Sequence, residues 1–165
     1  MRCGCNFRNT IMFDDKVLMI TGGTGSFGNT VLKRFLDINV REIRIFSRDE
    51  KKQEDMRIAM ANDKVKFYIG DVREPSSLAQ AMVGVEQIIH LAALIDYSAS
   101  EKEVFDANFE STRQLILAAK LQKIPPKIIF LSSTSIYRGV RGNIIDENTH
   151  PNPTNAYGKS KLASE

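Results

Sequence analysis

Short apolar runs alternate with amphipathic stretches along most of the chain. A short apolar run is typical of a buried strand, whereas apolar positions spaced by three and four residues predict a helix. On this basis we expect strands at residues 17–21, 42–46, 65–69, 87–91 and 127–132. Between and after them we expect helices at about 26–37, 49–61, 75–83, 101–122 and from 157 onward.

Strict alternation of strands and helices predicts an α/β fold with a doubly wound parallel sheet, because each helix carries the chain back to start the next strand. The expected strand order is 3-2-1-4-5, with helices on both faces. In such a sheet a ligand binds at the carboxyl ends of the strands, here between strands 1 and 4.

The first predicted strand runs directly into glycines, in the sequence Val-Leu-Met-Ile-Thr-Gly-Gly-Thr-Gly-Ser-Phe-Gly over residues 17–28. Gly22 permits a tight turn, Gly25 lets the backbone approach an anion, and Gly28 lets helix and strand pack closely. The following helix would direct its first N–H groups at a phosphate or pyrophosphate. The alternative is an ordinary strand–turn–helix corner with an additional glycine, Gly23.

A second group of candidate residues lies near the end of the sequence. Tyr157 and Lys161 are four residues apart, which places them on one face of a helix. A neighbouring cation favours the phenolate, so this tyrosine could exchange a proton with a substrate hydroxyl near neutral pH. Ser132, Ser133 and Thr134 follow the fifth strand at the same sheet edge, where a hydroxyl could hold the substrate oxygen. The alternatives are a solvated helix face and a polar turn.

Composition and charge narrow the class of protein. The formal net charge is only +3 and the basic residues are dispersed, so nucleic acid is not an expected partner. No stretch is apolar enough to span a membrane, and a reduced, cytoplasmic chain is expected, since Cys3 and Cys5 make a poor metal site and an improbable disulfide. We interpret residues 1–12 as a flexible extension preceding one domain, 13–165, with Met12 as a candidate start and 138–156 as a long loop.

Several motifs occur in a familiar order: the glycine turn, Gly70-Asp71-Val72, His90-Leu-Ala-Ala93, Asn108, Ser132-Ser133-Thr-Ser-Ile-Tyr137 and Tyr157-Gly-Lys-Ser-Lys161. Together they resemble the extended short-chain dehydrogenase/reductase superfamily, in particular its NAD(P)-dependent nucleotide-sugar epimerases and dehydratases. The resemblance runs from about Met12 to the last residue and implies a Rossmann fold with a bound nicotinamide cofactor.

The resemblance also implies a role for each matching residue. Tyr157 would be the catalytic acid/base, Lys161 would bind the nicotinamide ribose and tune the tyrosine, and Ser133 would be the catalytic serine. Asp71 would contact the adenine, with Asn108 as a structural residue of the fourth helix. No metal site is implied. The implied cofactor site comprises Gly22, Thr24, Gly25, Ser26, Phe27, Gly28, Ser47, Arg48, Asp71, Val72, Leu91, Ala92, Ala93, Asn108, Tyr157 and Lys161.

Four departures from the family pattern bear on cofactor and reaction. NAD-binding relatives place an acid after the second strand, whereas this chain has Ser47 and Arg48, with Asp49 next. Arg48, helped by Lys51 or Lys52, suits a 2′-phosphate, so NADP is favoured over NAD. The dehydratases also carry an acidic residue directly after the catalytic serine, where this chain has Thr134 and Ser135.

The remaining departures are Ile95, where many relatives have lysine, and the last residue, Glu165, since relatives continue for about as many residues again. We therefore expect an epimerase or reductase of nucleotide sugars, represented by its cofactor-binding half, the later part of the fold and the substrate domain being missing. A 4,6-dehydratase, a noncatalytic dinucleotide-binding module and a defective remnant are the alternatives. A homo-oligomer is expected.

Overall fold

The computed structural model describes residues 10–96, 98–141 and 144–165. Its centre is a five-stranded, fully parallel sheet with the predicted order β3-β2-β1-β4-β5. The strands are β1 (Val17–Thr21), β2 (Glu42–Ser47), β3 (Val65–Ile69), β4 (Gln87–His90) and β5 (Lys127–Phe130). The helices are α1 (Thr10–Phe13), α2 (Ser26–Leu36), α3 (Glu50–Met60), α4 (Pro75–Met82), α5 (Glu101–Phe105), α6 (Ser111–Lys120) and α7 (Ala156–Ser164).

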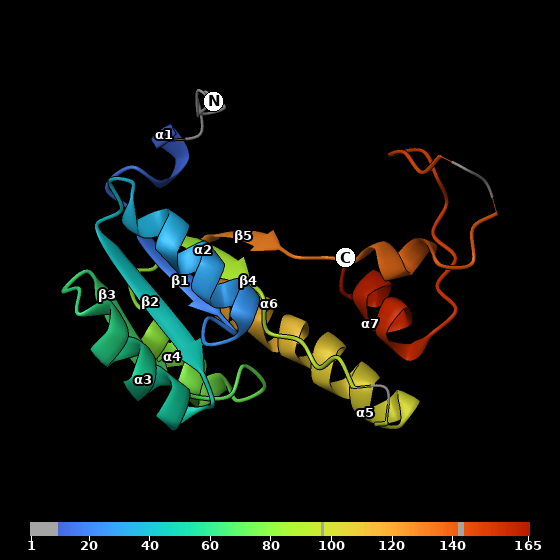
Figure 1. The fold of residues 1–165 in the computed structure, drawn as a ribbon, viewed down its shortest axis with the longest axis horizontal. Coiled ribbons are helices and arrows are strands. Elements are labelled where there is room, and N and C mark those ends of the chain that lie inside the picture. The colour runs from blue at the N-terminus through green and yellow to red at the C-terminus, as the bar shows by residue number, and fades with distance from the viewer. Residues whose placement is uncertain (1–9, 97, 142–143) are drawn as a thin grey trace.

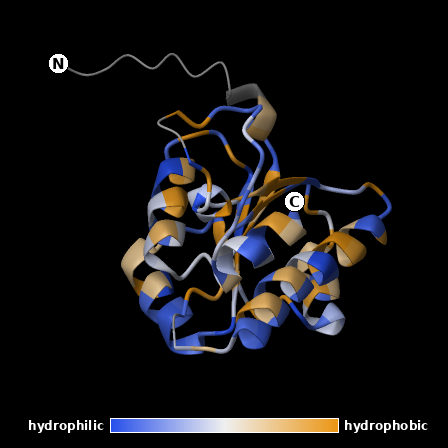
Figure 2. Cartoon of the chain, turned by 90° about the vertical axis from the view of Figure 1, so that its right-hand side faces the viewer, coloured by the Kyte–Doolittle hydropathy of each residue, from blue (hydrophilic) through white to orange (hydrophobic). Residues whose placement is uncertain are grey.

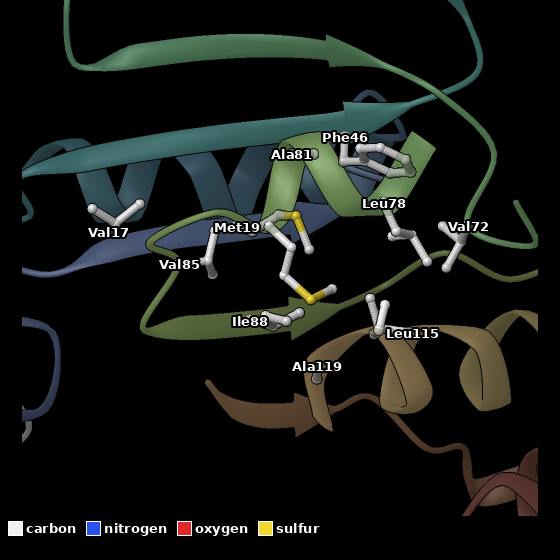
Figure 3. Close-up of a cluster of buried hydrophobic side chains, with 12 residues drawn as sticks. Val17, Met19, Phe46, Val72, Leu78, Ala81, Val85, Ile88, Leu115 and Ala119 are labelled. Atoms are coloured by element: carbon white, nitrogen blue, oxygen red, sulfur yellow. The ribbon is translucent and has the colours of Figure 1, made fainter. Parts of the chain in front are cut away.

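Helices cover both faces of the sheet, as the Rossmann order requires (Figure 1). Side chains of β1 are buried along its whole length and alternate between two separate hydrophobic clusters. Met19 and Ile88 pack with residues of α4 and α6 on one face (Figure 3). Leu18 and Ile20 pack with residues of α2 and α3 on the other face. The strands are therefore the apolar centre of the fold, and Figure 2 shows mostly hydrophobic strands surrounded by helices of mixed hydropathy.

The segment 101–122 was predicted as a single helix, but a π-helical turn interrupts it. The segment consists of α5, a π-helical turn η1 (Asp106–Glu110) and α6, in continuous succession. Ser100 and Glu103 form a capping box at the start of α5, which explains why the segment begins where the sequence suggests. The widened turn falls at the buried Asn108, whose side chain is committed to contacts outside the helix.

Smaller differences occur at element ends. β4 and β5 stop at His90 and Phe130, earlier than expected, because the backbone after them turns toward the cleft described below. A short 3-10 helix, η2 (Thr134–Tyr137), follows β5 in a segment for which no helix was predicted. Of the predicted extension 1–12, residues 1–9, including Cys3 and Cys5, lie outside the described residues. In the described part of the chain, no helix is long and apolar enough to cross a membrane.

Candidate functional site

A cleft of about 510 Å³ opens at the carboxyl end of the sheet, over the ends of β1 and β4. It lies where the strand order reverses, which is the binding position predicted for a doubly wound sheet. Every predicted cofactor residue except Asn108 lines it, and Tyr157 and Lys161 line it as well. Ser133 is not among the lining residues. Residues from both ends of the chain are thus brought to one site.

The glycine turn forms the floor of the cleft. Gly22 adopts a φ of +69°, and its N–H donates to the Phe46 carbonyl at 2.9 Å. A Cβ on Gly22 would lie 2.8 Å from the Ala92 nitrogen, and a Cβ on Gly28 would lie 2.5 Å from the Gly23 oxygen. Both positions therefore require glycine, the first for its backbone angle and the second for close packing of α2 on the turn.

The N-terminus of α2 is open toward the cleft. Its N-cap is Gly25, which has no side chain to accept from the first amides, whereas Asp49, Ser100 and Asn155 cap α3, α5 and α7. A Cβ on Gly25 would meet only the Gly22 oxygen, at 3.5 Å. Uncapped amides at a helix start carry partial positive charge and suit an anion. The turn is therefore shaped for a phosphate or pyrophosphate.

The far end of the cleft is basic. Arg73 holds the Asp71 carboxylate through three side-chain contacts of 2.6 to 3.2 Å, and Arg48 lies 3.5 Å from the same carboxylate. These hydrogen bonds from Arg73 lower the pKa of Asp71 to about 2, so it is ionised at neutral pH. Arg73 is absent from the sequence prediction, although its position two residues after Asp71 in the same turn could have indicated it.

The residues beside this end differ in their availability to a ligand. Ser47 is buried, and its hydroxyl accepts from the Gln53 amide at 3.1 Å. Asp49 accepts from the Lys52 backbone N–H at 2.9 Å and pairs with the Lys52 ammonium at 3.2 Å. Lys52 lines the cleft and Lys51 does not. The acid nearest the expected ribose position is therefore engaged in capping α3.

At the opposite end of the cleft, Lys161 is buried at 2% exposure and donates to the Leu131 carbonyl at 2.8 Å. Its ammonium lies 4.5 Å from the centre of the Phe130 ring and 5.9 Å from that of the Tyr157 ring. Burial lowers the pKa of Lys161 to about 8. A cation next to the tyrosine is thus present, and its charge is sensitive to pH just above neutrality.

Ser133 is the N-cap of η2, where its hydroxyl accepts from the Ser135 N–H at 3.1 Å. η2 packs directly against α7. A Cβ on Gly158 would lie 2.5 Å from the Ser135 oxygen, so the residue after Tyr157 must be small for this packing. The serine and the tyrosine are therefore carried by two elements in close contact.

Asn108 supports the cleft from behind. It is buried, accepts from the Leu94 N–H at 2.6 Å, and donates to the Leu94 carbonyl at 3.1 Å. It also donates to the Ser160 hydroxyl of α7 at 3.0 Å. Among the described residues, histidine, cysteine and acidic side chains form no group of three placed to hold a metal ion.

The profile of the NAD dependent epimerase/dehydratase family matches residues 18–165. The chain belongs to this family.

UDP-glucose 4-epimerase of Rickettsia bellii (strain RML369-C) is 46% identical over 161 residues, which cover 93% of this chain and 43% of that protein. The chain thus spans less than half the length of the curated relatives it matches. Among solved structures, Pen from Bacillus thuringiensis is 30% identical with a TM-score of 0.76, over 92% of this chain and 44% of that one. A UDP-glucose 4-epimerase structure is 25% identical with a TM-score of 0.76, over 90% and 45%.

Proposed function

We propose that this chain is the cofactor-binding half of an NAD(P)-dependent epimerase or reductase acting on nucleotide sugars. The observation that carries the proposal is the single cleft that joins the glycine turn to Tyr157 and Lys161. Two features fit a dinucleotide pyrophosphate. The backbone packs too closely at Gly22 and Gly28 for a Cβ, and the start of α2 has no side-chain cap.

The nicotinamide would supply reversible hydride transfer when bound. The chain's own residues handle the proton. Tyr157 takes the proton of the sugar hydroxyl as its carbon is oxidised and returns it when the ketone is reduced. The Lys161 ammonium, beside the Tyr157 ring, stabilises the phenolate. Ser133, which caps η2 next to α7, would share the hydrogen bond to the substrate oxygen. In a Tyr157→Phe variant of the complete enzyme this step would be lost.

Two observations support an epimerase or reductase over a 4,6-dehydratase. The relative at 46% identity is a UDP-glucose 4-epimerase. Removal of water across two sugar carbons also needs a titratable acid and base, and the segment after Ser133, η2 over Thr134–Tyr137, has no carboxylate. A second candidate is a noncatalytic dinucleotide-binding module, because the cleft contains the glycine turn whereas Ser133 is not among the residues that line it.

The family description names NAD. Within that family we propose that this chain prefers NADP, because Arg48 lines the basic end of the cleft while Asp49 and Lys52 are engaged with each other. A guanidinium can bind a 2′-phosphate bidentately, and an engaged carboxylate is a poor acceptor for a ribose 2′-hydroxyl. We also propose that the protein acts on a nucleotide sugar and forms a homo-oligomer.

Calorimetric titration of the chain with NAD and NADP tests cofactor binding. NADP should bind more tightly, and Arg48→Ala should weaken NADP binding about tenfold while changing NAD binding less than about twofold. Lys51→Ala, at an exposed lysine outside the cleft, is the matched control and should change neither. Tighter binding of NAD by the unmodified chain would contradict the preference, and binding of neither would contradict the cofactor site.

Turnover separates the two candidate functions. In the protein that contains this chain together with a substrate-binding part, Tyr157→Phe should abolish interconversion of UDP-sugars and leave cofactor affinity within about twofold. Saturable cofactor binding without turnover of any nucleotide sugar would favour the noncatalytic module. Light scattering measures the oligomeric state.

A further inference from the structure

Five buried polar side chains form a row beneath the cleft. Thr21 ends β1, His90 ends β4, and Thr112, Asn108 and Ser160 belong to α6, η1 and α7. Each is at most 4% exposed. Five polar side chains from five elements, all away from water, are costly unless each is hydrogen-bonded. Within the described residues all of them find partners, since buried side-chain atoms without one occur only on two glutamines elsewhere.

The first part of the row runs from the loop after β4 to η1. The Ala92 N–H donates to the Thr21 hydroxyl at 3.4 Å, and that oxygen lies 2.6 Å from Nδ1 of His90. Nε2 of His90 lies 3.2 Å from the Thr112 hydroxyl, which donates to the Asn108 carbonyl at 2.9 Å. His90 therefore bridges the strand that leads into the glycine turn and the helix that follows the π-helical turn.

These contacts fix the proton on one imidazole nitrogen. Because the Thr112 proton goes to the Asn108 carbonyl, the Thr112 oxygen can only accept from His90, so Nε2 carries the hydrogen. Nδ1 then accepts the Thr21 proton. Burial, with the nearby Lys161 charge, lowers the pKa of His90 to about 3, in agreement with a neutral ring.

The second part of the row reaches the tyrosine. The Asn108 amide donates to the Ser160 hydroxyl at 3.0 Å, and that hydroxyl donates to the Tyr157 carbonyl at 2.8 Å. The same Asn108 side chain holds both backbone groups of Leu94. Two hydrogen-bonded series therefore meet at Asn108: the series from Ala92 ends on its main-chain carbonyl, and the series to Tyr157 starts from its side-chain amide.

We propose that His90 is a positioning residue that fixes the position of the loop Leu91–Leu94 relative to α7, the helix that carries Tyr157. Ala92 lines the cleft, and Tyr157 would act on the substrate. The relative position of loop and helix therefore sets the distance between the backbone that would bind the cofactor and the side chain that would transfer the proton. The inference rests on the proposed function for its catalytic consequence, whereas the hydrogen-bonded row can be measured without any cofactor.

The tautomer of His90 is the first test. Long-range nitrogen–proton NMR spectra of the ¹⁵N-labelled chain should show a neutral Nε2–H ring that does not titrate between about pH 5 and 8. The other histidine in the sequence, His150, is a reference within the same spectrum. A neutral Nδ1–H tautomer, or a ring that titrates near pH 6.5, would overturn the proposal.

Substitution of Thr112 is the second test. Thr112→Val keeps the shape and removes the hydroxyl, leaving the His90 Nε2–H without an acceptor, whereas Thr112→Ser keeps the hydroxyl. In Thr112→Val, amide hydrogen exchange should accelerate about tenfold in residues 91–94 and in α7, with β2 and β3 unchanged, and cofactor affinity should fall about tenfold. Thr112→Ser should stay within about twofold of the unmodified chain.

Equal effects of the two substitutions, or an exchange increase spread evenly over the sheet, would show that Thr112 acts only through packing and would overturn the proposal. If Thr112→Val does not fold, the tautomer measurement on the unmodified chain decides. If the unmodified chain binds no cofactor, the proposed function fails while the exchange pattern still tests the hydrogen-bonded row.

Discussion

Gly25 and Gly28 stand three residues apart in one turn and meet different surroundings. Gly28→Ala would place a Cβ 2.5 Å from the Gly23 oxygen, so we expect a loss of about 1–3 kcal/mol in the free energy of unfolding. Gly25→Ala would meet only ordinary contact at 3.5 Å and should cost less than about 1 kcal/mol. Urea unfolding of both variants measures these losses.

Cofactor binding should rank the two variants in the opposite way. A methyl on Gly25 stands where an anion would approach the start of α2, so Gly25→Ala should weaken dinucleotide binding at least about tenfold in a well-folded chain. A Gly25→Ala chain that binds the dinucleotide normally would show that the ligand does not use this turn.

Asp71 gives a prediction on pH. Its pKa is lowered from 3.8 to about 2 in the folded chain, so it binds a proton less readily there than in the unfolded chain. Its contribution to stability is then fully present above about pH 4 and is lost as the pH falls toward 2. The stability difference between the unmodified chain and Asp71→Asn should shrink across this window in urea titrations. A difference that does not change with pH would contradict the Arg73–Asp71 pairing.

At the scale of residues, sequence reasoning succeeded where a single backbone requirement governs the position. Gly22 and Gly28 are required by a local angle and a local contact, and both are readable from spacing. Thr112 was missed because its role depends on a histidine 22 residues away, which only the fold brings close. Arg73 was missed although its partner, Asp71, is two residues away in the same turn. Whether Ser133 and Tyr157 act as catalytic groups stays a prediction.

Among the elements, α7 carries Tyr157 and Lys161. Its N-cap is Asn155, whose side chain accepts from the Gly158 N–H at 2.7 Å. Asn155→Ala should cost about 0.5–2 kcal/mol in the free energy of unfolding and should raise hydrogen exchange in the first turn of α7. Asn155→Asp keeps an acceptor at the N-cap and is the control, which should stay close to the unmodified chain. Equal losses in both variants would exclude capping as the cause.

The existence and order of the elements could be predicted because their apolar periodicity is strong and each strand is separated from the next by a helix. Their ends were harder to predict. The division of 101–122 into α5, η1 and α6 follows from Asn108 bonding to Leu94 and Ser160, and nothing in the helical pattern of that stretch signals such a contact. η2 arises where the Ser133 side chain caps a turn, a local choice that competes with an extended chain.

For the molecule as a whole, stability depends on the two hydrophobic clusters. Leu115 of α6 is fully buried in the cluster of Figure 3, so Leu115→Ala should cost about 2–5 kcal/mol in the free energy of unfolding. Leu121, which follows the same helix and is 85% exposed, is the matched control, and Leu121→Ala should change stability by less than about 0.5 kcal/mol. Similar losses in both would contradict the assignment of the core.

The alternation of β1 side chains between the two clusters has a further consequence. Among the described residues no side chain belongs to both clusters, because the hydrogen-bonded strands lie between them. A void opened on the α6 side cannot be relieved by residues on the α2 side, so Leu115→Ala and Leu32→Ala should lower stability additively in the double variant. Each face of the sheet can therefore accumulate core substitutions independently of the other, with α2 and α3 repacking on one face while α4 and α6 keep their packing on the other.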